Sequence, residues 1–377
     1  MNNRTGIYVH IPFCIRKCGY CDFVSNSKYE LEDKYFEKLI SEIEYRGRND
    51  EYKNKVINTI YFGGGTPSSV HPHNIEKVVV ALKENFDLSN LEEMSIEVNP
   101  GTCNNDNIGK YYEMGFNRLS IGVQSFDEDM LKRIGRIHNQ ADIYNTVNDA
   151  KEAGFGNISI DLMYGLPDDS LERVEKDLEL AKELEHQHIS TYGLIVEEGT
   201  RFHDELLEGT LKLPEEELLL QMRELINEKL KKDGFKRYEI ANYAKAGYES
   251  RHNLIYWKND DYYGFGLNST SKIGKMRFMN ESDINKYVES NNFEKYNLEE
   301  ITEEMKIEEA IFLGLRLIDG IDLKEFSNRY NIDIKEKYRK VLDELLDIKA
   351  IMLSDGDLRF TDYGLGISNY CLAKFLS

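Results

Sequence analysis

The sequence feature that most constrains the fold is a regular alternation of short β-rich runs and longer amphipathic stretches in the first half of the chain. Between the β-rich runs, apolar residues recur at helical spacing, as in Glu30–Tyr45, Asn74–Asn85 and Ser170–Leu184. Six β-then-α units in a row predict a parallel sheet with helices on its outside. We therefore expect an α/β fold built on a partial (β/α)6 barrel. The expected strands are Gly6–Ile11, Val56–Phe62, Met94–Val98, Arg118–Val123, Asn157–Met163 and Ile189–Val196.

The pattern changes after about Pro214, where the alternation of strands and helices stops. A predicted helix, Glu215–Lys232, is followed by an aromatic-rich stretch, Tyr238–Phe278, that we expect to be irregular. From Ile301 the chain predicts three helices and a hairpin, which is the outline of a winged-helix module. The hairpin strands are expected at Ile351–Leu353 and Leu358–Phe360, before a final helix, Tyr363–Phe375.

These patterns divide the chain into three expected parts: a barrel in residues 1–213, an extension and linker in 214–300, and a winged-helix-like domain in 301–377. Winged helices often bind DNA, but the last part carries 11 basic and 15 acidic side chains, which favours a packing or lid role. The whole chain has 48 basic and 68 acidic side chains, a formal net charge of −20. Such a surface repels phosphate backbones and anionic lipid, so we expect no nucleic-acid partner.

Cysteine usage and hydropathy indicate the compartment. No apolar run approaches the roughly 20 residues that span a bilayer, so no integral membrane segment is expected. The polar stretch from Met1 to Gly6 leads straight into the first strand, and no signal peptide is visible. The chain has five cysteines, an odd number, and three lie within eight residues. This pattern indicates a metal site in a reducing compartment, and we expect the cytoplasm.

The three clustered cysteines, Cys14, Cys18 and Cys21, directly follow the first expected strand. Three thiolates on a short loop can bind three irons of a cubane and leave the fourth iron open, and the amino and carboxylate groups of a methionine moiety could fill that position. The alternative is a structural zinc site or three unrelated thiols. Structural zinc usually takes four ligands in two pairs, and no second pair has suitable spacing. Cys103 and Cys371 are isolated, and we expect ordinary buried thiols there.

Polar or glycine-rich motifs stand where the other expected strands end. Gly63-Gly64-Gly65-Thr66-Pro67 follows the second strand, Glu97 ends the third, Gln124 ends the fourth and Asp161 lies on the fifth. Any one of these residues could equally be a local cap or a tight turn. A series of them is harder to dismiss, because the carboxyl ends of barrel strands converge on active sites.

Together these motifs resemble the radical-SAM superfamily and, more narrowly, the oxygen-independent coproporphyrinogen III oxidase family, over nearly the whole chain. The resemblance implies a radical-SAM barrel with a [4Fe–4S] cluster on Cys14, Cys18 and Cys21, beside S-adenosylmethionine (SAM). It also implies SAM contacts by Tyr8, Tyr20, Gly64, Gly65, Thr66, Glu97, Gln124, Arg136 and Asp161, with Ile195 as a backbone or adenine contact.

Two departures separate this chain from the oxidases of that family. The oxidases carry a further cysteine two positions after the third cluster cysteine, where this chain has Phe23. They also have an N-terminal extension, whereas 13 residues precede Cys14 here. Both departures point to the heme chaperone branch of the family, whose marker His-Asn-x-x-Tyr-Trp is present at residues 252–257. That branch usually has a histidine where this chain has Thr270.

The resemblance therefore implies a heme-binding carrier that passes heme to an unknown acceptor protein, with a flavodoxin or ferredoxin as electron donor. His10 and His252 are candidate axial ligands, because imidazole is a common ligand of heme iron. The alternatives are a cluster-loop hydrogen bond for His10 and a loop anchor for His252. Whether the chain is an enzyme stays open. The competing functions are decarboxylation of coproporphyrinogen III through a 5′-deoxyadenosyl radical and another radical-SAM modification of a small aromatic substrate.

Overall fold

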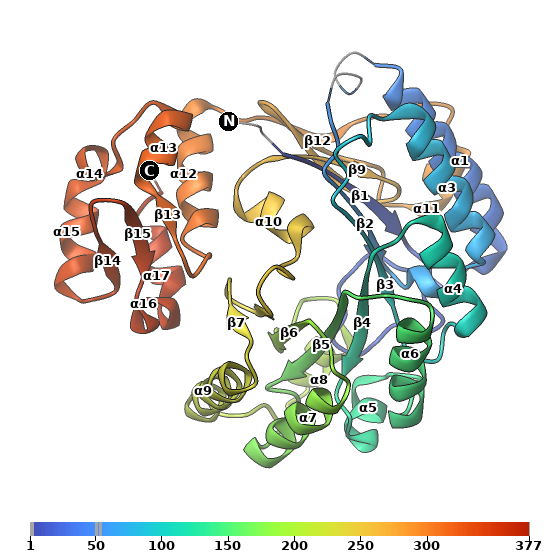
Figure 1. Cartoon of the computed structure of the whole chain (residues 1–377), viewed down its shortest axis with the longest axis horizontal. Coiled ribbons are helices and arrows are strands. Elements are labelled where there is room, and N and C mark those ends of the chain that lie inside the picture. Colours follow the sequence, from blue (N-terminus) through green and yellow to red (C-terminus); the bar gives the residue numbers. More distant parts are fainter. Residues whose placement is uncertain (1–3, 50–51, 53–54, 377) are drawn as a thin grey trace.

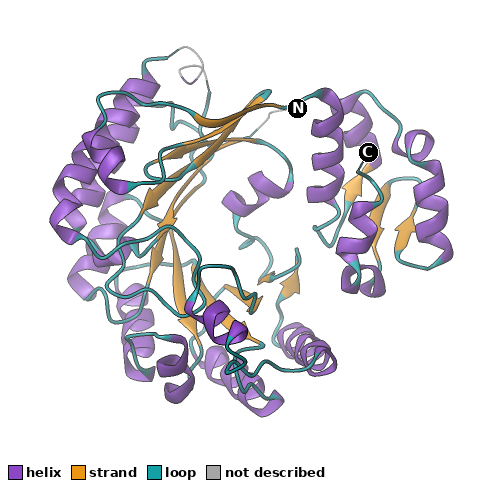
Figure 2. Ribbon diagram, turned by 180° about the vertical axis from the view of Figure 1, so that it is seen from behind, coloured by secondary structure: helices purple, strands orange, loops and turns teal. Residues whose placement is uncertain are grey.

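The β-rich runs of the first half form the centre of one large curved sheet, as expected. The fold is that of a computed structural model, which describes residues 4–49, 52 and 55–376. Six parallel strands lie side by side in chain order, and helices cover the convex face of the sheet in both views (Figures 1 and 2). The strands are β1 (Thr5–Ile11), β2 (Thr59–Gly64), β3 (Glu93–Val98), β4 (Arg118–Gln124), β5 (Ile158–Tyr164) and β6 (His188–Gly193).

Most helices of this part connect successive strands, and two follow the sixth strand. Side-chain caps begin several of them, such as Ser170, which accepts from the backbone N–H of Arg173 at the start of α7. The elements are η1 (Tyr29–Leu31), α1 (Glu32–Gly47), η2 (Pro67–Ser69), α3 (Pro72–Asn85), α4 (Asn105–Met114), α5 (Glu128–Ile134), α6 (Gln140–Glu152), α7 (Leu171–Glu183), α8 (Arg201–Leu207) and α9 (Glu216–Lys232).

The two faces of the central strands differ in chemistry. Residues that face the helices are apolar and fully buried, for example Val9 in β1, Phe62 in β2 and Ile121 in β4. Because side chains alternate along a strand, their neighbours face the concave side, and many of these are polar, such as Glu97 in β3 and Asp161 in β5. The apolar face forms the main core, and the concave face is left for polar chemistry.

The stretch expected to be irregular, Tyr238–Phe278, is largely regular, and the prediction was wrong. It holds one helix and strands that extend both edges of the sheet: β9 pairs with β1 in parallel, and β8 pairs with β6 in antiparallel fashion. These pairings join residues far apart in the chain, so local periodicity does not reveal them. The elements from here to residue 300 are β7 (Lys236–Arg237), β8 (Asn242–Ala244), α10 (Arg251–Trp257), β9 (Asp261–Phe265), β10 (Thr270–Ile273), β11 (Met276–Met279), α11 (Ile284–Glu289) and β12 (Tyr296–Glu300).

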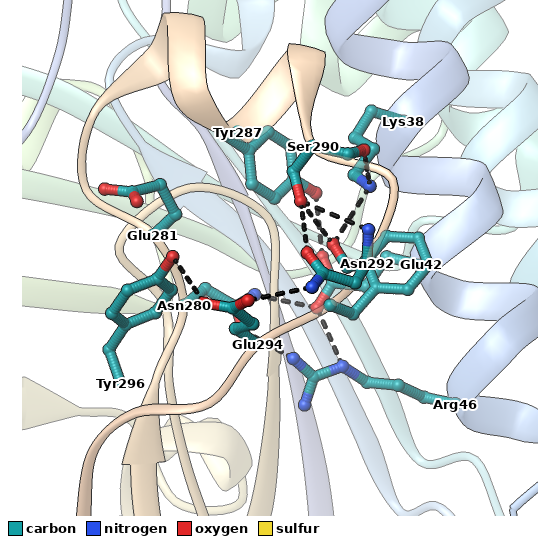
Figure 3. Close-up of a pocket in the computed structure, with 11 residues that line it drawn as sticks. Lys38, Glu42, Arg46, Asn280, Glu281, Tyr287, Ser290, Asn292, Glu294 and Tyr296 are labelled. Carbon is teal, nitrogen blue, oxygen red and sulfur yellow. Dashed lines mark hydrogen bonds and ion pairs between the residues drawn. The ribbon is translucent and has the colours of Figure 1, made fainter.

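A buried polar network fastens this added edge to α1 (Figure 3). Glu42 in α1 forms an ion pair with Arg46 at 2.9 Å and accepts from Asn280 at 2.7 Å and from Tyr287 at 2.7 Å. The cavity beside it measures about 20 Å³, which is room for about one water molecule. The Glu42 carboxylate is therefore surrounded by donors, as a buried charge requires.

Residues from about 301 onward form a separate module with its own hydrophobic core. The sheet of this module has one strand more than the predicted hairpin, the short β13. This strand pairs with β15, which gives the sheet order β13-β15-β14. The expected final helix is broken at Ile367, whose backbone leaves helical geometry after two glycines, Gly364 and Gly366, which weaken helices. The elements are α12 (Glu303–Gly314), β13 (Ile321–Asp322), α13 (Leu323–Tyr330), α14 (Ile334–Lys337), α15 (Arg339–Asp347), β14 (Ile351–Leu353), β15 (Asp357–Phe360), α16 (Asp362–Gly366) and α17 (Ser368–Ala373).

Helix α10 lies on the concave side of the sheet, between β1, β2 and β9 on one side and α12 of the module on the other (Figure 1). The module is tied to the same region by Arg329, which donates to the carbonyl oxygen of Lys258 at 2.8 Å and pairs with Asp260 at 2.9 Å. Within the described residues, no helix is long and apolar enough to cross a membrane.

Candidate cluster and cofactor site

The cysteine loop begins just after β1, and its end at Asn26 lies beside its start. The backbone N–H of Cys14 donates to Asn26 O at 2.9 Å, and that of Asn26 donates to Pro12 O at 2.7 Å, which closes the loop at its base. Its middle is held from the other side, because the N–H of Gly19 donates to Ile134 O at 2.8 Å. The loop that carries Cys14, Cys18 and Cys21 is therefore fixed at both ends and in the middle.

The glycine motif after β2 is packed tightly against this loop. The N–H of Gly65 donates to Ile11 O at 2.8 Å, and that of Thr66 donates to Phe13 O at 2.7 Å. A β-carbon on Gly65 would lie 2.7 Å from Phe13 O, and Gly64 adopts a φ of +112°, which favours glycine. The glycines thus allow the two loops to lie in backbone contact.

The three cysteines are free thiols that line one cavity. Burial raises the pKa of Cys14 and raises that of Cys21 to about 11, so binding of iron by these thiols would release protons. Among the described residues, no three His, Cys, Asp or Glu side chains converge on a single metal ion. A cubane does not require such convergence, because each thiolate binds its own iron.

A chain of hydrogen bonds links two of the cysteines. Cys14 Sγ lies 3.3 Å from Thr66 Oγ1, which accepts from Asn99 Nδ2 at 2.8 Å. Asn99 Oδ1 accepts from Arg136 Nη2 at 2.6 Å, and Arg136 Nη1 lies 3.9 Å from Cys18 Sγ. Hydrogen bonds and a cation beside cluster sulfurs stabilise negative charge there. Asn99 connects the two halves of this chain of hydrogen bonds. It was not among the residues predicted from the sequence, although it stands two positions after Glu97.

The cavity has a volume of about 460 Å³, within the range of small-molecule sites. It lies at the carboxyl ends of the strands, where the sequence predicted it. Tyr8 does not line it; its hydroxyl lies 3.1 Å from His10 Nδ1 instead. Tyr61 and Ser190, which were not predicted from the sequence, do line it. The predicted residues that line it are Cys14, Cys18, Tyr20, Cys21, Gly64, Gly65, Thr66, Glu97, Gln124, Arg136, Asp161 and Ile195.

Two carboxylates lie in the interior of this cavity. Glu97 accepts from Tyr61 Oη at 2.9 Å and from the N–H of Gly64 at 3.2 Å, and burial raises its pKa to about 7. Asp161 accepts from Ser120 Oγ at 3.2 Å, and burial raises its pKa as well. Perturbed carboxylates inside a cavity are typical of functional sites.

Gln124 is held in an uncommon conformation. Its φ is +66°, and the pairing of β4 with β5 shifts register between Gly122 and Gln124. Such bulges redirect a side chain, and left-handed geometry at a non-glycine residue is concentrated at functional sites.

Both candidate histidines are buried, and both ring nitrogens of each have partners. His10 Nε2 lies 2.9 Å from Val24 O, with Tyr8 at Nδ1. His252 Nδ1 lies 2.8 Å from Thr59 Oγ1, and its Nε2 lies 2.9 Å from Tyr256 Oη. Burial lowers the pKa of His10 to about 4 and that of His252 to about 3, so both rings are neutral at neutral pH. Coordination of iron by either ring would first require one of these hydrogen bonds to break.

Thr270 begins β10 and does not line the cavity. The marker at residues 252–257 forms most of α10, whose first N–H groups are capped from β3. Glu93 accepts from the N–H of Arg251 at 3.0 Å and from that of His252 at 3.1 Å. These two bonds fix the start of α10 against the sheet.

The fold and the cysteine loop place this chain in a known class. The model of the radical SAM superfamily matches residues 8–181, and the model of the HemN C-terminal domain matches residues 301–366. The class is therefore that of radical SAM proteins with a HemN-type C-terminal domain.

Relatives similar over nearly the full length define the family within that class. The heme chaperone HemW of Lactococcus lactis is 36% identical, with 98% of this chain and 96% of the relative covered. The heme chaperone HemW of Bacillus subtilis is 36% identical, with 98% of each chain covered. This chain belongs to the HemW family.

The solved structure of coproporphyrinogen III oxidase (HemN) from Escherichia coli has the same fold. Its TM-score is 0.86, and the match covers 99% of this chain and 90% of that one. The two sequences are 22% identical, so this likeness concerns the fold alone.

As a radical SAM protein, the chain takes a [4Fe–4S] cluster and SAM as its cofactors. Its residues fit both groups. Three thiols on one loop suit a cluster, and the cavity beside them offers carboxylates, backbone amides and a guanidinium to a nucleoside and a methionine moiety. A reduced cluster supplies one electron to the SAM sulfonium. The residues that line the cavity would hold the two groups beside each other.

Replacing Asn99 by leucine is expected to disturb the cluster without removing it. The variant leaves Thr66 and Arg136 without their shared partner, at a cost of about 1–3 kcal/mol. We expect an altered electron paramagnetic resonance spectrum of the reduced cluster and SAM binding weakened by roughly tenfold. Asn105→Ala, which removes a surface hydrogen bond to Glu152, is the control. An unchanged spectrum and unchanged SAM affinity in Asn99→Leu would exclude the proposed link.

SAM affinity is expected to fall as the pH drops through about 7, the pKa of Glu97. Because burial raises this pKa, Glu97 gains a proton below it and loses the charge that would accept from ribose hydroxyls. Binding should be roughly tenfold weaker at pH 6 than at pH 8. Calorimetric titration measures this, and Glu97→Gln should bind weakly with the Glu97-linked part of the pH dependence removed. The same pH profile in both proteins would contradict the assignment.

Proposed function

We propose that this protein carries heme and passes it to an acceptor protein, with its cluster and SAM serving regulation or assembly. The observation that carries the proposal is the similarity over nearly the whole length to relatives named heme chaperone HemW. Phe23, in place of the oxidases' further cysteine, and the marker at residues 252–257 support it.

Within this function, Cys14, Cys18 and Cys21 bind the cluster, and the cavity residues bind SAM. The proposed SAM contacts are Tyr20, Gly64, Gly65, Thr66, Glu97, Gln124, Arg136, Asp161 and Ile195; Tyr8 is left out because it does not line the cavity. The proposed electron donor is a flavodoxin or a ferredoxin. The proposed location is the cytoplasm, whose reducing conditions suit cluster thiolates.

The buried histidines limit how heme iron is bound. The hydrogen bonds of His252 to Thr59 and Tyr256 must open before its ring can reach iron, and the same holds for His10 with its own partners. We propose that His252 becomes a ligand only if α10 shifts. Heme capture therefore needs contacts outside the two histidines.

Hemin titration of the anaerobically reconstituted protein tests the function. We expect a shifted Soret band that saturates at a fixed ratio of hemin to protein. The same sample, given reduced donor and coproporphyrinogen III, should form no protoporphyrinogen. Absence of saturable hemin binding would contradict the proposal, and protoporphyrinogen formation would favour the oxidase function instead.

A further inference from the structure

Large apolar side chains stand exposed around the opening of the cluster cavity. Phe23 is 63% exposed and Ile15 is 54% exposed, both on the cysteine loop. Ile137, after α5, is 46% exposed, and Ile195, after β6, is 69% exposed. All four line the same cavity, so three separate segments of the chain contribute to one apolar rim.

Single exposed apolar residues are ordinary on protein surfaces, but a contiguous group around a cavity marks a binding site. Of the four, Ile195 is also a proposed SAM contact, whereas Phe23, Ile15 and Ile137 have no assigned role in SAM binding. The rim also needs no backbone rearrangement to receive a ligand, in contrast to the buried His252.

Two cations stand beside the apolar rim. Arg16 and Lys17 lie exposed on the cysteine loop next to Ile15 and line the same cavity. Neither forms an ion pair within the part of the chain that the structure describes. Asp22 and Glu197 also line the cavity, so the rim as a whole is not net positive. What distinguishes Arg16 and Lys17 is that they are adjacent in the sequence and unpaired among the described residues. In a chain of formal net charge −20, such a pair suits a ligand with acidic groups.

We propose that heme docks on this rim, with one face of its ring on Phe23, Ile15, Ile137 and Ile195 and its propionates toward Arg16 and Lys17. This inference rests on the proposed function and specifies where the cargo sits. A flat apolar ring with two carboxylates matches an apolar rim beside two cations. Docking of this kind relies on ring and propionate contacts and does not depend on the iron.

Two porphyrins and three variants test the site. The reconstituted full chain is titrated with hemin, followed by the Soret band, and with metal-free protoporphyrin IX, followed by its fluorescence. Phe23→Asp and Ile137→Asp each place a charge on the rim, and Ile137 lies outside the cysteine loop. Leu207→Asp is the matched control, because Leu207 is 74% exposed on α8 and does not line the cavity. Cluster absorption and SAM affinity are measured on every variant to establish that the site is intact.

If heme docks on the rim, wild-type protein should bind both porphyrins. Each rim variant should bind them roughly tenfold or more weakly, because it loses an apolar contact that the bound porphyrin would bury. Leu207→Asp should bind like wild type. Rim variants with an intact cluster and wild-type affinity would overturn the inference while leaving the proposed function in place. Hemin binding without binding of metal-free protoporphyrin would also overturn it, because iron ligation would then dominate. Wild-type protein that binds no hemin would overturn the proposed function itself.

Discussion

Replacing Cys14, Cys18 or Cys21 by serine is expected to abolish the brown chromophore that forms on anaerobic reconstitution. Each thiolate binds one iron, and a serine hydroxyl at the same place is a poor ligand for a cubane. We expect near-complete loss of cluster absorption and of bound iron in each of the three variants. Visible spectroscopy and iron analysis of the same samples measure this.

Cys103→Ser is the matched control for those variants. Cys103 is a free, half-buried thiol that lies outside the cavity, so its replacement should leave iron content and absorption as in wild type. Retained iron and unchanged absorption in all three cluster variants would refute the assignment of the cysteine loop.

Gly65→Ala is expected to have a large effect on the cluster site although it leaves every polar side chain in place. The added β-carbon would lie 2.7 Å from Phe13 O, 2.8 Å from Ile11 O and 2.9 Å from Phe13 N, and all three are backbone atoms that cannot move independently. Overpacking of this kind costs about 1–3 kcal/mol. The cysteine loop should shift with it, so both the free energy of unfolding and cluster loading should fall. Denaturant unfolding and iron analysis measure the two effects.

Gly109→Ala provides the contrast to Gly65→Ala. Gly109 lies inside α4, and a β-carbon there would meet no atom within 4 Å. Because glycine weakens helices relative to alanine, this variant should gain up to about 1 kcal/mol of stability and load its cluster normally. Equal stability and equal loading in the two variants would show that the contact between the glycine loop and the cysteine loop is unimportant.

The barrel could be predicted from the sequence because its signals are local. Alternating strands and helices appear as changes of hydrophobic period, and polar residues such as Glu97 and Asp161 interrupt otherwise apolar strand ends. The cysteine spacing is likewise local, and it indicated one loop. The structure places these residues around one cavity because parallel strands bring their carboxyl ends to the same edge.

The parts that the sequence did not reveal depend on distant pairing. β9 joins β1 across most of the chain, and β13 pairs with β15, a strand more than thirty residues further along the chain. Asn99 likewise gains its role from Thr66 and Arg136, which come from other elements. The position of Tyr8 behind the cavity depends on the side-chain packing around His10, which no local pattern encodes.

Transfer of heme to an acceptor tests the central claim most directly. Cluster-reconstituted protein loaded with one equivalent of hemin is mixed with a heme-free hemoprotein, and the Soret band of the acceptor is followed over time. We predict that the acceptor fills while the donor's shifted Soret band is lost and its cluster absorption is retained. Hemin that binds to no saturable site on the donor, or that stays on the donor with every acceptor offered, would contradict the account.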